Sequence, residues 1–239
     1  MPRLDIRGEI CANDDKELLD WYGIESTCPK EVKDAIDATL PGETLDIYIN
    51  SPGGEIFNGS DIYTMIREAS ASKDIKLHIS GLAASAASII AMSGFCDMSP
   101  TAMMMVHCVS TVTAGNHTDM EKSAETLRAA DEALCSAYTA KSGMTKEDAL
   151  NMMEHTTWLT AKEAFELGLV DSIMFGDTET PAYTNSFAGS SLTPEMRAKA
   201  KAALNKEPET IPEQILDDTK AKMFAYNKRK LELSVRKPI

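Results

Sequence analysis

The chain has 239 residues, of which 43% are hydrophobic and 26% are charged, and its formal net charge is −13 at pH 7. These values are typical of a soluble globular protein with one sizeable domain and an appendage. The acidic excess argues against nucleic acid or an anionic membrane surface as a partner. No apolar run is long enough to span a bilayer, and residues 1–10 lack the apolar core of a signal peptide, so a cytoplasmic location is expected.

The five cysteines are odd in number and show no CxxC pairing. Neither a disulfide framework nor a zinc site is therefore indicated, and we expect reduced thiols, no metal and no cofactor. These residues are Cys11, Cys28, Cys96, Cys108 and Cys135.

The N-terminal segment predicts one strand and one helix. Leu4–Ile10 alternates between apolar and polar residues, as a half-buried strand does. Cys11–Ser26 follows as a polar, irregular segment. A helix with Pro29 in its first turn comes next, and either Ser26 or Thr27 is expected to cap it.

Strands and helices then alternate. Leu45–Ile49 predicts a strand that leads into Asn50–Gly54 (NSPGG), and a helix is expected over residues 56–66 before a strand over Ile75–Ser80. Strand and helix units of about 30 residues imply right-handed crossovers and a largely parallel sheet. The sequence therefore predicts the α/β class.

Ser85 lies where the strand over Ile75–Ser80 gives way to a helix over Ala86–Ser93, with a sharp turn expected at Gly81. A serine at such a turn suits a nucleophile, because the first amides of the helix are unpaired donors that can face a developing oxyanion. The alternative is that AASAAS is a small-residue helix packed in a core.

The remaining elements are shorter strands and three helices with clear caps. Gly143 ends the long helix, Thr145 caps the next, and Thr160 caps the last. The predicted strands cover Phe95–Met98 and Ala102–Val106, and the predicted helices cover Thr118–Lys141, 146–153 and 161–167.

The composition changes after Phe175. We expect one globular domain over residues 1–175, a linker rich in glycine, serine and threonine over 176–191, and a charged tail over 192–239 that is mostly helical or disordered.

A serine nucleophile needs a base within hydrogen-bond reach, and the chain has four histidines. His107 is the best placed because it ends an apolar run that would deliver it to the edge of the sheet. His78 falls on a strand face, His117 lies in a polar segment, and His155 has no such context. Gly53-Gly54 could expose backbone amides to a substrate.

Four motifs together resemble the ClpP family of self-compartmentalising serine peptidases. They are NSPGG, GLAAS at Gly81–Ser85, the MMVH run ending at His107, and WLTAKEAFELGLVDSI at Trp158–Ile173. More closely, the chain is similar to ClpP-like proteases encoded in phage and prophage head-gene clusters. The resemblance implies a crotonase-like fold of repeated ββα units, a ring-shaped homo-oligomer, heptameric as a single or double ring, and an enclosed chamber.

The resemblance also implies roles for individual residues. Ser85 matches the nucleophile and His107 the general base, while the amides of Gly54 and Ala86 match the oxyanion hole. The long helix over Thr118–Lys141 corresponds to the element by which rings of the family pair.

The third triad position departs from the family pattern, because Thr156 stands where the family has an acidic residue. Threonine can accept the histidine N–H but supplies no charge for the imidazolium. Glu154 is near enough in sequence to substitute, whereas Asp171 matches a family residue other than the catalytic acid. Thr156 and Glu154 both remain candidates.

The sequence begins almost at its first strand, so an ATP-dependent unfoldase partner is not expected. The leading hypothesis is an ATP-independent serine endopeptidase that processes phage capsid or scaffold protein. The alternatives are a crotonase-like enzyme acting on an acyl-CoA through carboxylate acid and base groups, and a ring-forming assembly subunit whose catalytic site has decayed.

Overall fold

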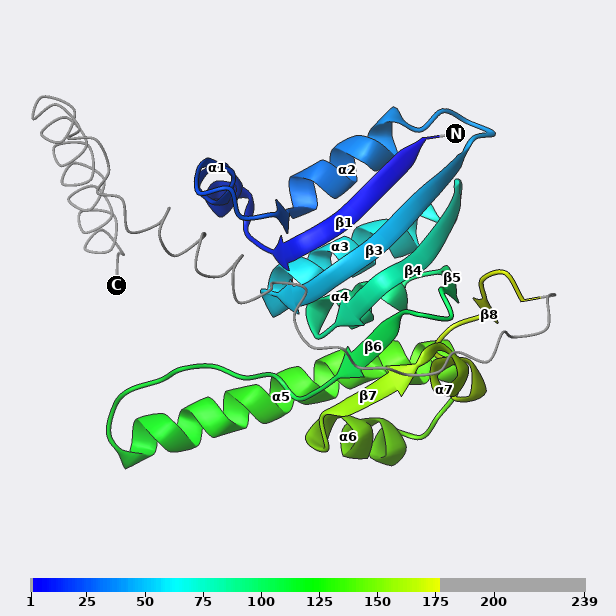
Figure 1. Cartoon of the computed structure of the whole chain (residues 1–239). Coiled ribbons are helices and arrows are strands. Elements are labelled where there is room, and N and C mark those ends of the chain that lie inside the picture. Colours follow the sequence, from blue (N-terminus) through cyan, green and yellow to red (C-terminus); the bar gives the residue numbers. More distant parts are fainter. Residues whose placement is uncertain (1, 177–239) are drawn as a thin grey trace, which may run out of the picture. The chain divides into compact units, whose positions relative to one another are not determined.

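A computed structural model describes residues 2–176, so the predicted linker beyond residue 176 and the tail over 192–239 lie outside the described residues. The described part contains one eight-stranded sheet, and this confirms the predicted α/β class with a mostly parallel sheet (Figure 1). Its strands are β1 (Arg3–Ile10), β2 (Ser26–Thr27), β3 (Thr44–Gly54), β4 (Asp74–Ala84), β5 (Phe95–Met98), β6 (Met103–Val106), β7 (Thr157–Thr160) and β8 (Ser172–Ile173). Its helices are α1 (Asn13–Trp21), α2 (Pro29–Ala38), α3 (Ile56–Ala69), α4 (Ala86–Ala91), α5 (His117–Ser142), α6 (Lys146–Glu154) and α7 (Ala161–Glu166).

The sheet has the order β2-β1-β3-β4-β5-β8, and β6 pairs with the C-terminal part of β4. Every pairing is parallel except that of β6 with β7. Helices α2, α3 and α4 cover one face (Figure 1), where alternate strand residues such as Ile47, Leu77 and Ile79 are fully buried. None of the helices within residues 2–176 has the length and apolar character needed to cross a membrane.

Strand β4 is longer than the sequence predicts, and the sharp turn expected at Gly81 is wrong. The strand continues to Ala84, and its register with β3 shifts between Ile49 and Ser51. Gly81 instead lies close to the side chain of Asn50, whose oxygen would be 2.5 Å from a Cβ at this position. The chain therefore turns at Ser85, immediately before α4.

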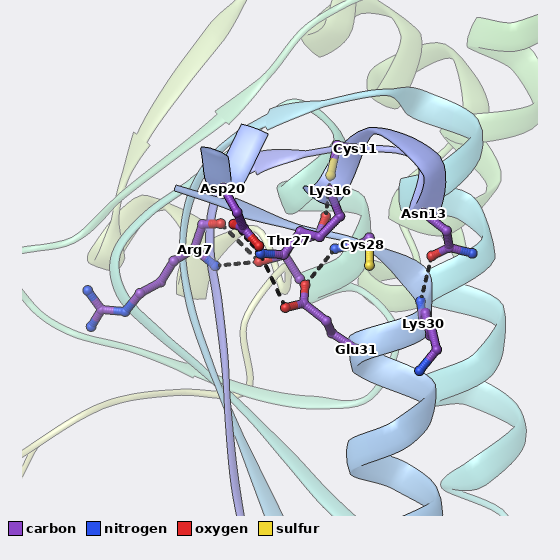
Figure 2. Close-up of polar contacts among 9 residues, drawn as sticks. All are labelled: Arg7, Cys11, Asn13, Lys16, Asp20, Thr27, Cys28, Lys30 and Glu31. Atoms are coloured by element: carbon purple, nitrogen blue, oxygen red, sulfur yellow. Dashed lines mark hydrogen bonds and ion pairs between the residues drawn. The ribbon is translucent and has the colours of Figure 1, made fainter. Parts of the chain in front are cut away.

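The expected caps of α2 are also wrong. The hydroxyl of Thr27 donates to the carbonyl of Arg7 and accepts from its amide, both at 2.9 Å, so it is occupied with β1 (Figure 2). Cys28 is the N-cap residue, and its amide donates to the carboxylate of Glu31 at 3.0 Å. The cap thus falls one residue after Thr27 and two after Ser26.

Helix α1 occupies part of the segment expected to be irregular. It has no buried residue, and Leu18 and Trp21 are exposed, so it lacks the apolar face that would have revealed it. Lys16 pairs with Asp20 one turn later, and the side-chain oxygen of Asn13 accepts from the amide of Lys30 at 2.9 Å (Figure 2). The latter bond fastens α1 to the start of α2.

The long helix α5 is buried only near its C-terminus, at Cys135, Ala137 and Tyr138. Its N-terminal part extends away from the sheet (Figure 1). As predicted, Gly143 ends the helix in a left-handed conformation with φ 77°. Thr160 likewise caps α7 through a reciprocal pair with Glu163.

Candidate active site

Ser85 connects β4 to α4 with a backbone that few residues adopt. Its φ is 55° and its ψ is −127°, a region costly for any residue with a Cβ. The amide of Ser85 donates to the carbonyl of Met105 at 2.9 Å, and its carbonyl accepts from the amide of Ser88 at 2.9 Å. The turn is therefore held on both sides, and it projects the Ser85 side chain from the end of the strand.

Gly53 makes room for this turn. A Cβ at Gly53 would lie 2.6 Å from the Cβ of Ser85 and 2.6 Å from the carbonyl oxygen of Ala84. The end of β3 thus passes against the turn with no space for a side chain.

His107 directly follows β6, which runs parallel to the last residues of β4. Since parallel strands end at the same edge of a sheet, this pairing brings His107 beside Ser85. His107 Nε2 lies 2.8 Å from Ser85 Oγ. For the imidazole to accept the serine proton at Nε2, its own proton must be on Nδ1.

No hydrogen bond to His107 Nδ1 is formed by any residue within 2–176. Strand β7 pairs with β6 so that Thr157 faces Val106 in the last pair of the ladder, and Thr156 and His107 are the residues next beyond that pair. Thr156 is exposed and has a φ of 49°, and Glu154 is exposed at the end of α6. The two candidates therefore belong to the segment that pairs with the strand before His107, but neither forms a hydrogen bond to the histidine.

A single carbonyl fixes the turn that carries Thr156. The oxygen of Met153 accepts from the amide of Thr156 and from the amide of Cys108, each at 3.1 Å. The end of α6 is thereby attached to the residue that follows His107.

Gly54 and Ala86, the two residues with candidate oxyanion-binding amides, lie on different elements. Ala86 is the first residue of α4, and a helix leaves its first amides without partners inside the helix. Gly54 ends β3 with a φ of 151°, and a Cβ there would lie 2.2 Å from the carbonyl oxygen of Ile10. Gly54 therefore lies against β1 with no room for a side chain, and Ala86 directly follows Ser85.

Sequence analysis missed a cavity of about 660 Å³ beside this turn. It is bounded by the start of α3, by the segment after His107 and by one side of α5, with Gly54, Phe57, Val109 and Leu127 among its lining residues. A smaller cavity lined by Ser85, His107 and Tyr138 shares Ile56 and Val109 with it. The partly apolar stripe on α5 was the sequence feature that could have indicated this cavity.

The other histidines and Asp171 lie away from Ser85. His78 contacts Asp97 at 2.7 Å and Asp46 at 3.1 Å across three strands, and His155 Nδ1 lies 2.8 Å from the carbonyl of Asn151. His117 begins α5. Asp171 accepts from the amide of Cys96 at 2.6 Å and pairs with Lys141, which ties α5 to the strand β5.

Cys108 adjoins the histidine but is poorly suited to act as a nucleophile. Burial, reinforced by the carboxylate of Asp131, raises the pKa of its thiol to about 11. All five cysteines are free thiols. Within residues 2–176, no group of histidine, cysteine and acidic side chains is arranged to hold a metal ion.

Comparison with known proteins gives a consistent result. The family model described as Clp protease matches residues 34–177. The chain is 30% identical over 176 residues to the ATP-dependent Clp protease proteolytic subunit 1 of Chlamydia trachomatis, which covers 67% of this chain and 90% of that protein. It is 29% identical over 142 residues to the ATP-dependent Clp protease proteolytic subunit of Bacteroides fragilis, covering 58% of this chain and 68% of the relative. The corresponding subunit of Porphyromonas gingivalis is also 29% identical over 142 residues, covering 58% of this chain and 63% of the relative.

Proposed function

Because this chain belongs to the Clp protease family, we propose that it is a serine endopeptidase with Ser85 as nucleophile and His107 as general base. The observation that carries the proposal is the 2.8 Å contact between His107 Nε2 and Ser85 Oγ at a strained strand-to-helix turn. A nucleophile and a base within hydrogen-bond reach are the minimum that acyl transfer requires.

The reaction follows from this pair. Ser85 Oγ attacks the scissile carbonyl carbon while His107 Nε2 takes the serine proton, and the carbonyl oxygen becomes an oxyanion. The amides of Ala86 and Gly54 donate to that oxyanion. His107 then passes its proton to the departing amine, and the ester left on Ser85 is hydrolysed by a water that His107 deprotonates.

Either Thr156 or Glu154 is the residue that we expect to orient His107. Thr156 is favoured by the β6–β7 ladder, because Thr156 and His107 are the residues next beyond its last pair, Thr157 and Val106. Its hydroxyl would accept the Nδ1 proton and hold the tautomer, but it would leave the imidazolium without a counter-charge. Basal activity below that of a full serine–histidine–aspartate triad is therefore expected.

The finer parts of the proposal concern assembly and substrate. The partly exposed apolar residues of α5, among them Met120 and Leu127, support a homo-oligomer. From the family resemblance we expect this oligomer to be a heptameric ring or double ring. The phage-like motifs support the cleavage of capsid or scaffold protein without an ATP-dependent unfoldase.

A catalytically decayed, ring-forming subunit is the second candidate. It is favoured by the lack of a hydrogen bond from any residue of 2–176 to His107 Nδ1. Such a subunit would assemble normally but would cleave no peptide.

Labelling by a fluorophosphonate probe separates these candidates, because the probe reacts only with an activated serine. The wild type should be labelled, Ser85→Ala should not, and Ser93→Ala should be labelled like the wild type. Equal labelling of wild type and Ser85→Ala would remove Ser85 from the mechanism. No labelling of a correctly assembled wild type would favour the decayed subunit or a crotonase-like enzyme.

A further inference from the structure

Two buried hydroxyl groups lie next to the turn that carries Ser85. Ser88 belongs to α4 and Tyr138 to α5, and the Oγ of Ser88 lies 2.7 Å from the hydroxyl oxygen of Tyr138. Their exposed fractions are 0% and 1%. This bond is a direct polar link between the long helix and the helix that begins at the candidate nucleophile.

The direction of this link follows from counting protons. The hydroxyl of Ser88 donates to the carbonyl oxygen of Ser85 at 2.7 Å. A serine hydroxyl has one proton, so towards Tyr138 it can only accept, and Tyr138 must be the donor. Burial raises the pKa of the Tyr138 phenol, so the donor keeps its proton at any pH at which a peptidase works.

This chain of hydrogen bonds ends at the peptide group between Ser85 and Ala86, whose amide is the candidate oxyanion donor. The carbonyl of Ser85 and the amide of Ala86 belong to one planar peptide unit, so the direction of one sets the direction of the other. Ser85 has φ 55° and ψ −127°, and a residue in so sparsely populated a region keeps its conformation only where its surroundings hold it. The Ser88 hydroxyl is one of the groups that hold it.

We propose that Tyr138 and Ser88 are positioning residues that aim the amide of Ala86 at the oxyanion. This inference rests on the proposed function, and it adds two residues that act through the backbone of Ser85 rather than on the reacting atoms. Tyr138 donates to Ser88, Ser88 donates to the carbonyl of Ser85, and the shared peptide plane directs the amide of Ala86. A successive pair of hydrogen bonds in a dry interior strengthens each member.

The competing explanation is that Tyr138 fills the core and merely satisfies its hydroxyl on Ser88. Loss of that hydroxyl would then lower the melting temperature and leave the chemistry unchanged. The positioning role predicts a different pattern, because only the transition state and its analogues carry an oxyanion.

The decisive variant is Tyr138→Phe, which removes one oxygen and keeps the ring. We expect kcat for a fluorogenic peptide to fall about 10-fold with KM within about 2-fold, since loss of a whole oxyanion donor costs about 10² to 10³ and a misdirected one costs less. The affinity for a peptide boronic acid, whose tetrahedral adduct occupies the oxyanion site, should fall by the same factor.

Ser88→Ala should give the same pattern, and the double variant should be no worse than Ser88→Ala alone, because the two residues act in series. Ser93→Ala is the matched control. The hydroxyl of Ser93 also donates at 2.7 Å to the carbonyl three residues earlier and is also buried, but that carbonyl belongs to Ile90. Its kcat and boronate affinity should equal those of the wild type.

An unchanged kcat and boronate affinity in Tyr138→Phe would overturn the proposal, whatever happens to its melting temperature. An equal loss in Ser93→Ala would also overturn it, since any buried hydroxyl would then have the same effect. If the wild type itself fails to react with the fluorophosphonate probe, the proposed function fails first and takes this inference with it. If Ser88→Ala does not fold, Tyr138→Phe alone decides.

Discussion

The substitution Thr156→Asp should raise kcat by supplying the charge that the site lacks. The estimate takes residue 156 to continue the β6–β7 register beyond Val106 and Thr157, where opposed Cβ atoms lie about 5 Å apart. Two unit charges at that distance attract by about 1 to 3 kcal/mol for effective dielectric constants between 80 and 20. Thr156 is exposed, so the lower part of that range applies before the imidazolium becomes covered by substrate.

That energy corresponds to a gain in kcat of about 5- to 150-fold. The gain in kcat cannot exceed the factor of about 10⁴ that a serine protease loses when the acid of its triad is replaced by a neutral group. The assay is the rate of cleavage of a fluorogenic peptide by correctly assembled protein, with the concentration of active sites counted by the fluorophosphonate probe.

Thr156→Asn is the matched control for the backbone. Residue 156 has a φ of 49°, which is costly for a β-branched residue and better tolerated by asparagine and aspartate. Both variants relieve this strain, but only Thr156→Asp adds a charge. Equal kcat values for the two variants would refute the reasoning, because the charge would then not reach His107. If Glu154 orients the histidine instead, Glu154→Gln should be damaging and Thr156→Val nearly silent.

Three further predictions concern the turn, the assembly and a helix cap. Gly53→Ala should abolish peptidase activity, since its Cβ would lie 2.6 Å from that of Ser85, and retained kcat would contradict this. The protein should be larger than a dimer because α5 is buried only near its C-terminus, and light scattering that gives a stable monomer near 26.0 kDa would refute this. The amide and hydroxyl of Thr160 hold the pKa of Glu163 below its usual 4.5, so its contribution is complete at neutral pH and is lost as the pH falls through the depressed pKa. The melting temperatures of Glu163→Gln and wild type should therefore differ at pH 7, and the difference should shrink as the pH falls through the depressed pKa, whereas a constant difference would contradict this.

Local sequence signals were sufficient for the central elements of the fold. The alternation in Ile75–Ser80 and the small residues after it were enough to indicate a strand, a turn and a helix around Ser85. They did not reveal that β4 continues past Gly81, because the residues after it pair with β6, which comes later in the chain. Glycine signals a turn and a close approach equally well.

Elements that lack an apolar face, or that pair over only a few residues, could not be predicted from the sequence. Helix α1 buries none of its residues, so no periodicity marks it. Strand β7 has four residues, and it became part of the sheet through its antiparallel partner β6, which is a tertiary feature. The bond between Ser88 and Tyr138 joins residues 50 positions apart, and no local pattern announces it.

The shared carbonyl of Met153 has a mechanical consequence. This carbonyl accepts from the amide of Cys108 and from the amide of Thr156. A displacement of the end of α6 therefore moves Cys108 and Thr156 in the same direction. The spacing between His107 and residue 156 is then largely protected from such a displacement. The spacing between His107 and Ser85 is held separately, because the amide of Ser85 donates to the carbonyl of Met105, two residues before His107. The stretch from Met105 to Cys108 is therefore attached at its start to the turn of the nucleophile and at its end to α6, with the base between the two anchors.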